Sequence, residues 1–131
     1  MIRALLLAAV ALFIIPAWAK KAEPGWQVVF NAYKMDFYAD LGAMQIRPDN
    51  TRLVWVLSDS KQGVNSEGAH SNISLQEYDC ARGAFRYLLL LSYAGRMGEG
   101  ELLRIERYRP NESPYMKGSP IKTERICEYR T

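Results

Sequence analysis

Short segments rich in apolar, β-branched and aromatic residues, separated by turn-forming residues, run through most of this chain. Several alternate between apolar and polar positions, which is typical of β-strands rather than of helices. The pattern therefore predicts a sheet of about six strands. The segments are Trp26–Phe30, Tyr33–Ala39, the weaker Met44–Arg47, Thr51–Leu57, Ser71–Cys80, Ala84–Tyr93 and Glu101–Arg109.

Three of these segments allow a prediction of which side chains share a face. Thr51–Leu57 is apolar on both faces, so it should be a central strand. Strict alternation along Ala84–Tyr93 places Leu88 and Leu90 opposite the other apolar residues of that strand. In the last strand, alternation turns Leu103 and Ile105 inward and sets Arg104, Glu106 and Tyr108 on the opposite face.

The C-terminal segment predicts one short helix. Ser119 is a suitable N-cap and Pro120 a suitable first helical residue, so the helix is expected over Ile121 to about Tyr129. A helix of this length is marginal in water without tertiary contacts. It is therefore expected to pack on the sheet.

The N-terminus predicts export. Arg3 precedes an unbroken apolar run over Ala4–Ile15, and small residues at Ala17 and Ala19 follow the break at Pro16. This is the pattern of a secretory signal peptide with cleavage after Ala19. A membrane anchor is the alternative, but twelve residues of helix rise only about 18 Å, against a hydrocarbon core of about 30 Å. We predict a signal peptide over residues 1–19, a mobile leader over 20–24, one domain over 25–131, and no membrane span after cleavage.

Export places the two cysteines in an oxidising compartment. Cys80 and Cys127 are therefore predicted to form a disulfide, with two free buried thiols as the alternative. Two cysteines and one histidine are too few for a Cys/His zinc site, and we expect no metal or cofactor. A formal net charge of +3 over 131 residues gives no electrostatic argument for a nucleic-acid partner.

The sequence signals for catalytic groups are weak. The glycines of Ala94–Gly100 lie between two predicted strands, so they indicate a hairpin connection rather than a phosphate-binding loop. Glu77 and Asp79 share a strand face and could form an acid/base pair, but a solvated strand face is favoured. His70 has no nucleophile motif near it and is expected to be an exposed loop residue. We therefore expect a protein that is not an enzyme.

Two regions are candidates for partner binding. One is the polar loop Ser58–Ala69 with His70 at its edge, and the other is the strand face that bears Arg104 and Tyr108. The alternative for the second region is a solubilising strand with cross-strand ion pairs, which Glu106 favours. The candidate contact residues are Arg104, Tyr108 and His70.

A set of residues in order along the chain resembles the bacterial surface-adhesin protein E family. The set covers roughly Gly25–Glu128 and comprises Trp26, Val54-Trp55-x-Leu57, Glu77-Tyr78-Asp79-Cys80, Arg86, Tyr93, Met97-Gly98-x-Gly100, Gly118-Ser119 and Ile126-Cys127. The resemblance implies a small antiparallel sheet carrying one helix, a disulfide between the two cysteines, and an exported protein of a family whose best-known member is a surface adhesin that binds host matrix proteins. The chain departs from that adhesin, a lipoprotein, in having no lipid-anchor cysteine near the predicted cleavage point, and it departs from the family pattern in its sequence before Gly118.

Together these observations predict an α+β fold of about six antiparallel strands, one short C-terminal helix packed on the sheet, and one disulfide. The function we expect is an exported, non-enzymatic binding protein of the periplasm or cell surface. Host matrix proteins or envelope proteins are the expected partners. The alternative is a periplasmic structural or assembly protein that forms a homodimer through its sheet, as the apolar strand Ala84–Tyr93 suggests.

Overall fold

The computed structural model describes residues 24–130. The predicted signal peptide, its cleavage site and the leader up to residue 23 lie outside the described residues. In the described part, no helix has both the length and the apolar character needed to cross a bilayer.

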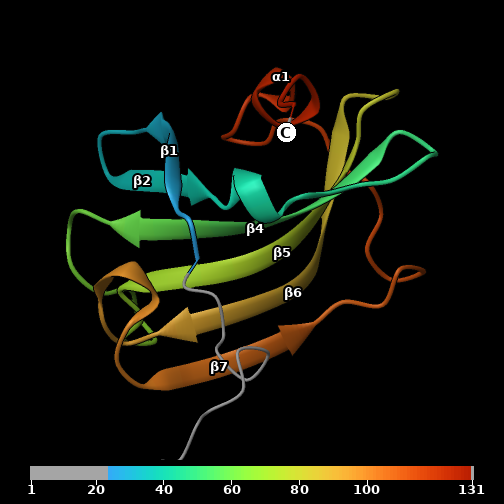
Figure 1. Cartoon of the computed structure of the whole chain (residues 1–131). Helices are drawn as coiled ribbons and strands as arrows, with labels where there is room; N and C mark the ends of the chain where they lie inside the picture. Colours follow the sequence, from blue (N-terminus) through green and yellow to red (C-terminus); the bar gives the residue numbers. More distant parts are fainter. Residues whose placement is uncertain (1–23, 131) are drawn as a thin grey trace, which may run out of the picture.

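A single seven-stranded antiparallel sheet forms the body of the protein (Figure 1). Its strand order is β1-β2-β4-β5-β6-β7, with the two-residue β3 also paired to β4. One short helix, α1, follows the last strand, so the predicted α+β fold is confirmed. The strands are β1 Gln27–Asn31, β2 Met35–Ala39, β3 Gln45–Ile46, β4 Thr51–Ser60, β5 Ser71–Asp79, β6 Ala84–Tyr93 and β7 Leu102–Arg107; α1 is Thr123–Cys127.

Strand β4 is central, as its two apolar faces predict. It pairs with β2 and β3 on one side and with β5 on the other. It is three residues longer than expected, because Ser58 pairs with Phe37 of β2 and with Asn72 of β5. Pairing on both sides carries polar residues into the strand, so the predicted loop Ser58–Ala69 is shortened to residues 61–70.

The register defines two faces of the sheet. We call the face that carries Val54, Tyr78 and Phe85 the inner face, because these side chains form the core with the C-terminal segment. The opposite, outer face carries Leu57 and Ile73. An irregularity in the pairing of β5 with β6 leaves Leu88 unpaired, so Leu90 lies on the inner face. The face assignment of β6 by strict alternation was therefore wrong beyond Tyr87.

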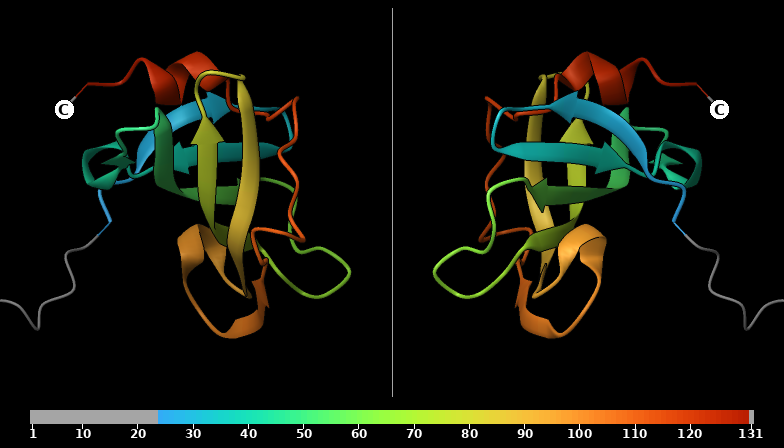
Figure 2. Two further views of the ribbon diagram at one scale, coloured as in Figure 1. Left: turned by 90° about the vertical axis from the view of Figure 1, so that its right-hand side faces the viewer. Right: turned by 90° about the vertical axis from the view of Figure 1, so that its left-hand side faces the viewer.

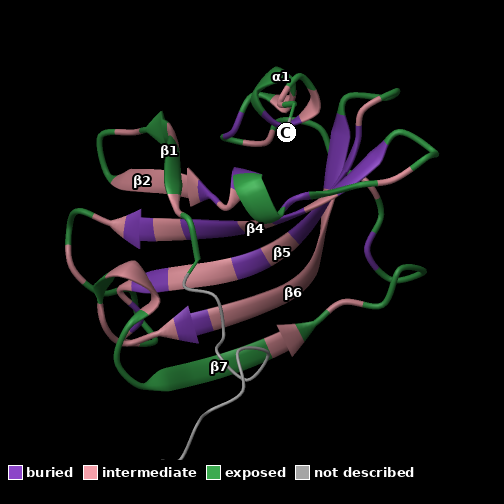
Figure 3. Ribbon diagram, in the orientation of Figure 1, coloured by how far each residue is buried: buried purple, intermediate pink, exposed green. Residues whose placement is uncertain are grey.

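The core occupies only one end of the inner face. Ile121 and Ile126, from the segment around α1, are almost fully buried against Tyr78 and Phe85. Figure 2 shows α1 lying across one end of the curved sheet. The buried apolar residues of the core lie at that end, whereas buried polar residues, among them Asp59, Ser71 and Ser92, lie at the other end and β7 is largely exposed (Figure 3).

The helix is shorter than predicted and begins later. It spans five residues with Lys122 in the N-cap position, so the expected start at Ser119 was wrong. The hydroxyl of Ser119 instead accepts a hydrogen bond from the Ile121 amide and lies 3.2 Å from the Tyr78 hydroxyl. These bonds hold the chain before α1 against the sheet without a helical turn.

Two links hold α1 in place. The predicted disulfide is confirmed: Cys80, just after β5, is bonded to Cys127, the last residue of α1. The buried guanidinium of Arg52 donates to the carbonyl oxygens of Ile126 and Tyr129 at 2.7 and 2.6 Å. The Ile126 carbonyl lies in the last turn of the helix, where it lacks an intrahelical donor and where positive charge is favourable; Tyr129 lies two residues beyond the helix.

The outer face is partly covered by the connection between β6 and β7. This connection contains the 3₁₀ turn η3, Arg96–Gly98, whose Gly98 packs on Ile73 and Leu57. Asp59, fully buried, accepts hydrogen bonds from the Met97 amide and the Arg96 guanidinium. The Ala94–Gly100 segment is thus a strand connection, as predicted, held to the outer face by a buried carboxylate.

Strand β7 lies at the open edge of the sheet, beyond η3. Leu103 and Ile105 are 38% and 53% exposed. The prediction that they point inward was therefore wrong. The core is at the far end of the opposite face, and no element among residues 24–130 beyond β7 covers this edge.

Candidate functional site

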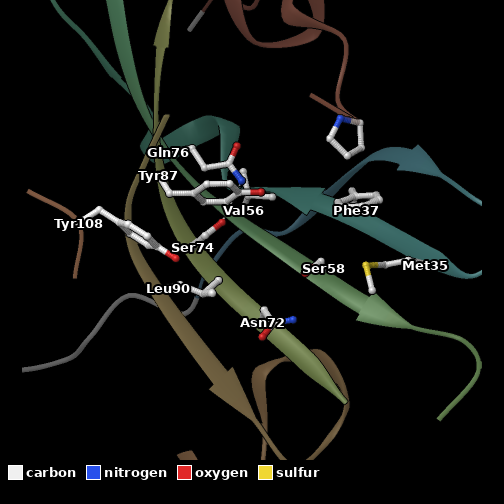
Figure 4. Close-up of a pocket in the computed structure, with 11 residues that line it drawn as sticks. Met35, Phe37, Val56, Ser58, Asn72, Ser74, Gln76, Tyr87, Leu90 and Tyr108 are labelled. Carbon is white, nitrogen blue, oxygen red and sulfur yellow. Dashed lines mark hydrogen bonds between the residues drawn. The ribbon is translucent and has the colours of Figure 1, made fainter. Parts of the chain in front are cut away.

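The inner face opens into a groove beyond the core (Figure 4). Its volume is about 410 Å³, which is within the range of roughly 300–1,000 Å³ typical of small-ligand sites. Strands β2, β4, β5 and β6 supply most of its lining. We call this feature the groove, and its lining residues are Met35, Phe37, Val56, Ser58, Asn72, Ser74, Gln76, Tyr87, Leu90, Tyr108 and Pro120.

The floor of the groove is a row of polar side chains on β5. Asn72, Ser74 and Gln76 alternate with outward-facing residues and so share the inner face. The Tyr78 hydroxyl donates to Gln76 Oε1 at 3.0 Å, and Gln76 Nε2 donates to the Ser74 hydroxyl at 2.9 Å. This hydrogen-bonded chain fixes the orientation of the Gln76 amide.

Further along the floor, some polar groups have no partner. Ser92 donates to Asn72 Oδ1 at 2.8 Å, which leaves the Asn72 amide nitrogen free to donate elsewhere. Neither this nitrogen nor the Ser58 hydroxyl makes a hydrogen bond within residues 24–130. Both belong to residues that line the groove, so they are available to a ligand.

Aromatic and apolar side chains form the walls. Tyr87 and Tyr108 stand on one side with their hydroxyls directed into the groove, and Phe37 and Met35 stand on the other (Figure 4). The ring centroids of the two tyrosines are 6.2 Å apart. Burial raises the pKa of Tyr87; burial and neighbouring Glu106 raise the pKa of Tyr108. Both hydroxyls are therefore protonated, and can donate, at neutral pH.

Charged residues lie beside the groove and not in it. Arg104 of β7 contacts Glu67 of loop 61–70 at 2.8 Å and Glu106 at 3.2 Å. We call Glu67, Arg104 and Glu106 the rim. The ion pair between Arg104 and Glu106 lies within β7, so it is not a cross-strand pair of the kind expected, and the contact of Arg104 with Glu67 was not expected either. The contact between Arg104 and Glu67 joins β7 to loop 61–70, the two regions that the sequence predicted separately as candidates for partner binding.

The three candidate contact residues are placed differently. Arg104 is exposed on the rim and Tyr108 lines the groove, so these two share one face. His70 is half-buried rather than exposed. Its backbone joins neighbouring strands, because its amide donates to Tyr93 and its carbonyl accepts from Ser60. His70 does not line the groove.

The prediction of a solvated face for Glu77 and Asp79 was wrong, since both are buried. Glu77 accepts from Arg47 at 2.8 Å and from Arg86 at 2.7 Å, and Tyr115 also donates to it. Burial alone would raise the pKa of Glu77. The hydrogen bonds from Tyr115 and Arg86, with the Arg86 charge, outweigh burial and lower it.

This arrangement anchors the chain instead of performing acid/base chemistry. Burial and the adjacent Glu77 raise the pKa of Tyr115 to about 12, so neither partner exchanges a proton near neutral pH. The Arg86 guanidinium also lies 4.4 Å from the Tyr115 ring centroid. Over the described range, no group of three or more His, Cys, Asp or Glu side chains converges as a metal site would require.

The sequence can now be compared with those of known families. The sequence pattern of the family described as "Surface-adhesin protein E" matches residues 26–127. The chain belongs to the surface-adhesin protein E family. This adhesin E domain therefore includes every strand and the helix described above. Comparisons with curated proteins and with solved structures give no match.

The groove is a feature of this adhesin E domain that the sequence analysis missed. The sequence did contain a sign of the groove, because polar residues occupy every second position of β5 from Asn72 to Gln76. On a strand whose other face is apolar, this pattern indicates a polar sheet face. The missing information was that no helix among residues 24–130 covers this end of the sheet.

Proposed function

We propose that this protein is an exported, non-enzymatic adhesin that binds host extracellular-matrix proteins through the groove and its rim. The observation that carries the proposal is the family match over residues 26–127. The groove and rim support it as the contact surface, because they combine accessible hydrogen-bonding groups with exposed charge on one face.

Binding can be tested with a pair of variants on one strand. Arg104 and Arg107 are both exposed residues of β7, but Arg104 shares the inner face and Arg107 pairs with Leu89 on the outer face. We expect the exported protein to bind immobilised fibronectin, laminin or collagen, more weakly at high salt. Arg104→Glu should weaken binding about tenfold or more, since reversal of a rim charge opposes association. Arg107→Glu should leave it within about twofold.

Absence of salt-sensitive binding to every matrix protein at micromolar concentration would refute the proposal. An equal loss of binding in Arg104→Glu and Arg107→Glu would show that the contact surface is not the rim. A location experiment complements this one: protease added to intact cells should cleave a surface-exposed adhesin. Complete protection in the periplasm would exclude direct adhesion and favour envelope partners.

The second candidate function is assembly through a homodimer, and the exposed edge strand favours it. Leu102, Leu103 and Ile105 are 42%, 38% and 53% exposed on β7, whose outer edge is unpaired within the described sheet. Such an edge can pair with a second strand. Light scattering at high concentration should then show a dimer that Ile105→Lys abolishes, and a strictly monomeric protein would refute this candidate.

A further inference from the structure

The groove is lined entirely by uncharged side chains. Hydroxyls come from Ser58, Ser74, Tyr87 and Tyr108, and amides come from Asn72 and Gln76. The nearest charges described above form the rim beside the groove, where Glu67 and Glu106 are both paired with Arg104 and the net charge is −1. An anionic ligand would lose hydration on entering the groove without gaining a counter-charge, and a cationic ligand would have to displace Arg104 from the rim carboxylates.

An apolar ligand fits no better, despite the aromatic walls. It would cover the Asn72 amide nitrogen and the Ser58 hydroxyl, which have no partner within residues 24–130. Covering an unpaired donor costs its full desolvation free energy. The ligand must therefore offer several hydrogen-bonding groups as well as apolar surface.

An extended peptide is also disfavoured, because the groove lies on a sheet face. Peptides that add to sheets gain affinity from main-chain hydrogen bonds at an edge. The strands under the groove, β4 and β5, are each paired on both sides, so their backbone groups are already used. A ligand in the groove is recognised by side chains alone.

We propose that the groove binds an uncharged oligosaccharide. This inference rests on the proposed function, because it names the ligand class of the same binding face. Sugar hydroxyls both donate and accept, which matches the unpaired Ser58 hydroxyl and the free amide nitrogen of Asn72. The apolar C–H face of a pyranose ring packs on the aromatic walls, where Tyr87 and Tyr108 present rings and hydroxyls together.

The test is a nuclear magnetic resonance titration of the exported protein with lactose, maltotriose and chitotriose. A sulfated heparin tetrasaccharide is the charged control. We expect at least one neutral sugar to bind at millimolar concentration and to shift the side-chain amide signals of Asn72 and Gln76. The heparin fragment should not shift them.

Two matched pairs of variants locate the binding. Asn72→Asp keeps the oxygen that accepts from Ser92 and removes the free donor, so the sugar should bind about tenfold more weakly. Asn111→Asp makes the same chemical change at an exposed position outside the groove and should have no effect. Tyr108→Ala should weaken binding similarly, whereas Tyr33→Ala, at a position 85% exposed, should not.

The outcomes separate this inference from the proposed function. Sugar binding that Asn72→Asp weakens supports the inference even if no matrix protein binds. If the protein binds a matrix protein but no neutral sugar shifts the amide signals of Asn72 and Gln76, the inference is overturned and the proposed function stands. Shifts caused by the heparin fragment alone also overturn it.

Discussion

The carboxylate of Glu77 allows a sharp test of how this domain is held together. It is 5% exposed and accepts hydrogen bonds from two arginines and Tyr115. The three partners come from the β3–β4 turn, from β6 and from the segment before α1. Glu77→Gln keeps the size of the side chain and removes its charge. It should therefore weaken three parts of the structure at once.

The magnitude follows from the exposure of the partners. Removal of one member of a fully buried ion pair costs about 3–5 kcal/mol. Arg86 is 18% exposed and Arg47 is 39% exposed, so Arg47 can recover hydration when its partner is lost. We expect the free energy of unfolding to fall by about 2–4 kcal/mol. For a domain of this size, the melting temperature should then fall by roughly 10 °C or more.

The effect should depend on pH, because the pKa of Glu77 is lowered in the folded protein. A carboxylate with a depressed folded pKa stabilises the fold fully above its unfolded pKa, and this stabilisation is lost as the pH falls through the folded pKa. The gap between wild type and Glu77→Gln should thus be widest at pH 7 and shrink in acid, below about pH 4.5. Urea unfolding without reductant measures both chains from neutral pH to about pH 3.

Glu112→Gln is the matched control. Glu112 is exposed in the neighbouring segment, and its loss should change stability by less than about 0.5 kcal/mol. A gap between wild type and Glu77→Gln that stays constant over the whole pH range would refute the reasoning, because the charge of Glu77 would then not be the source of the stability.

Three further predictions concern covalent and packing constraints. Gly98→Ala places a Cβ 2.5 Å from a carbon of Ile73 at a φ of +71°, and should lower the free energy of unfolding by about 1–3 kcal/mol. Gly63→Ala, at a φ of +93° in open space, is the control and should lower it by less. Equal losses of stability in urea unfolding would exclude the clash as the cause. Asp59→Asn should cost about 1–3 kcal/mol by presenting an amide to the Arg96 guanidinium, and an unchanged melting temperature would contradict this. Replacing Cys80 and Cys127 with serine should cost about 2–5 kcal/mol, and mass spectrometry of the unreduced wild type should find no free thiol.

The strands were predictable from the sequence where pairing is regular. Both faces of β4 are apolar, and it is the central strand, while β6 has the predicted bounds. The face assignment of β6 failed at Leu88, because an extra unpaired residue reverses every later side chain and leaves no reliable mark in one strand's sequence.

Burial of charge was harder to predict than strand position. Glu77 and Asp79 sit at alternate positions of β5, which by itself suggests a solvated face. Their partners are distant in sequence: Arg47 lies thirty residues earlier and Tyr115 thirty-eight residues later. A polar pattern on a strand shows that hydrogen-bonding groups are present, but only the tertiary structure shows whether water or other side chains satisfy them.

The position of the groove follows from the lengths of the elements. Five residues of α1 rise about 7.5 Å, whereas the ten residues of β4 extend about 33 Å. A helix this short can cover only one end of the inner face, and the disulfide to Cys80 fixes it at the end where Tyr78 and Phe85 are buried. Among residues 24–130, no helix covers the other end. Its buried polar side chains, Ser74, Gln76 and Ser92, are satisfied by hydrogen bonds along the sheet. The fold thus leaves a polar, aromatic-walled surface available for binding because its helix is too short to cover the sheet.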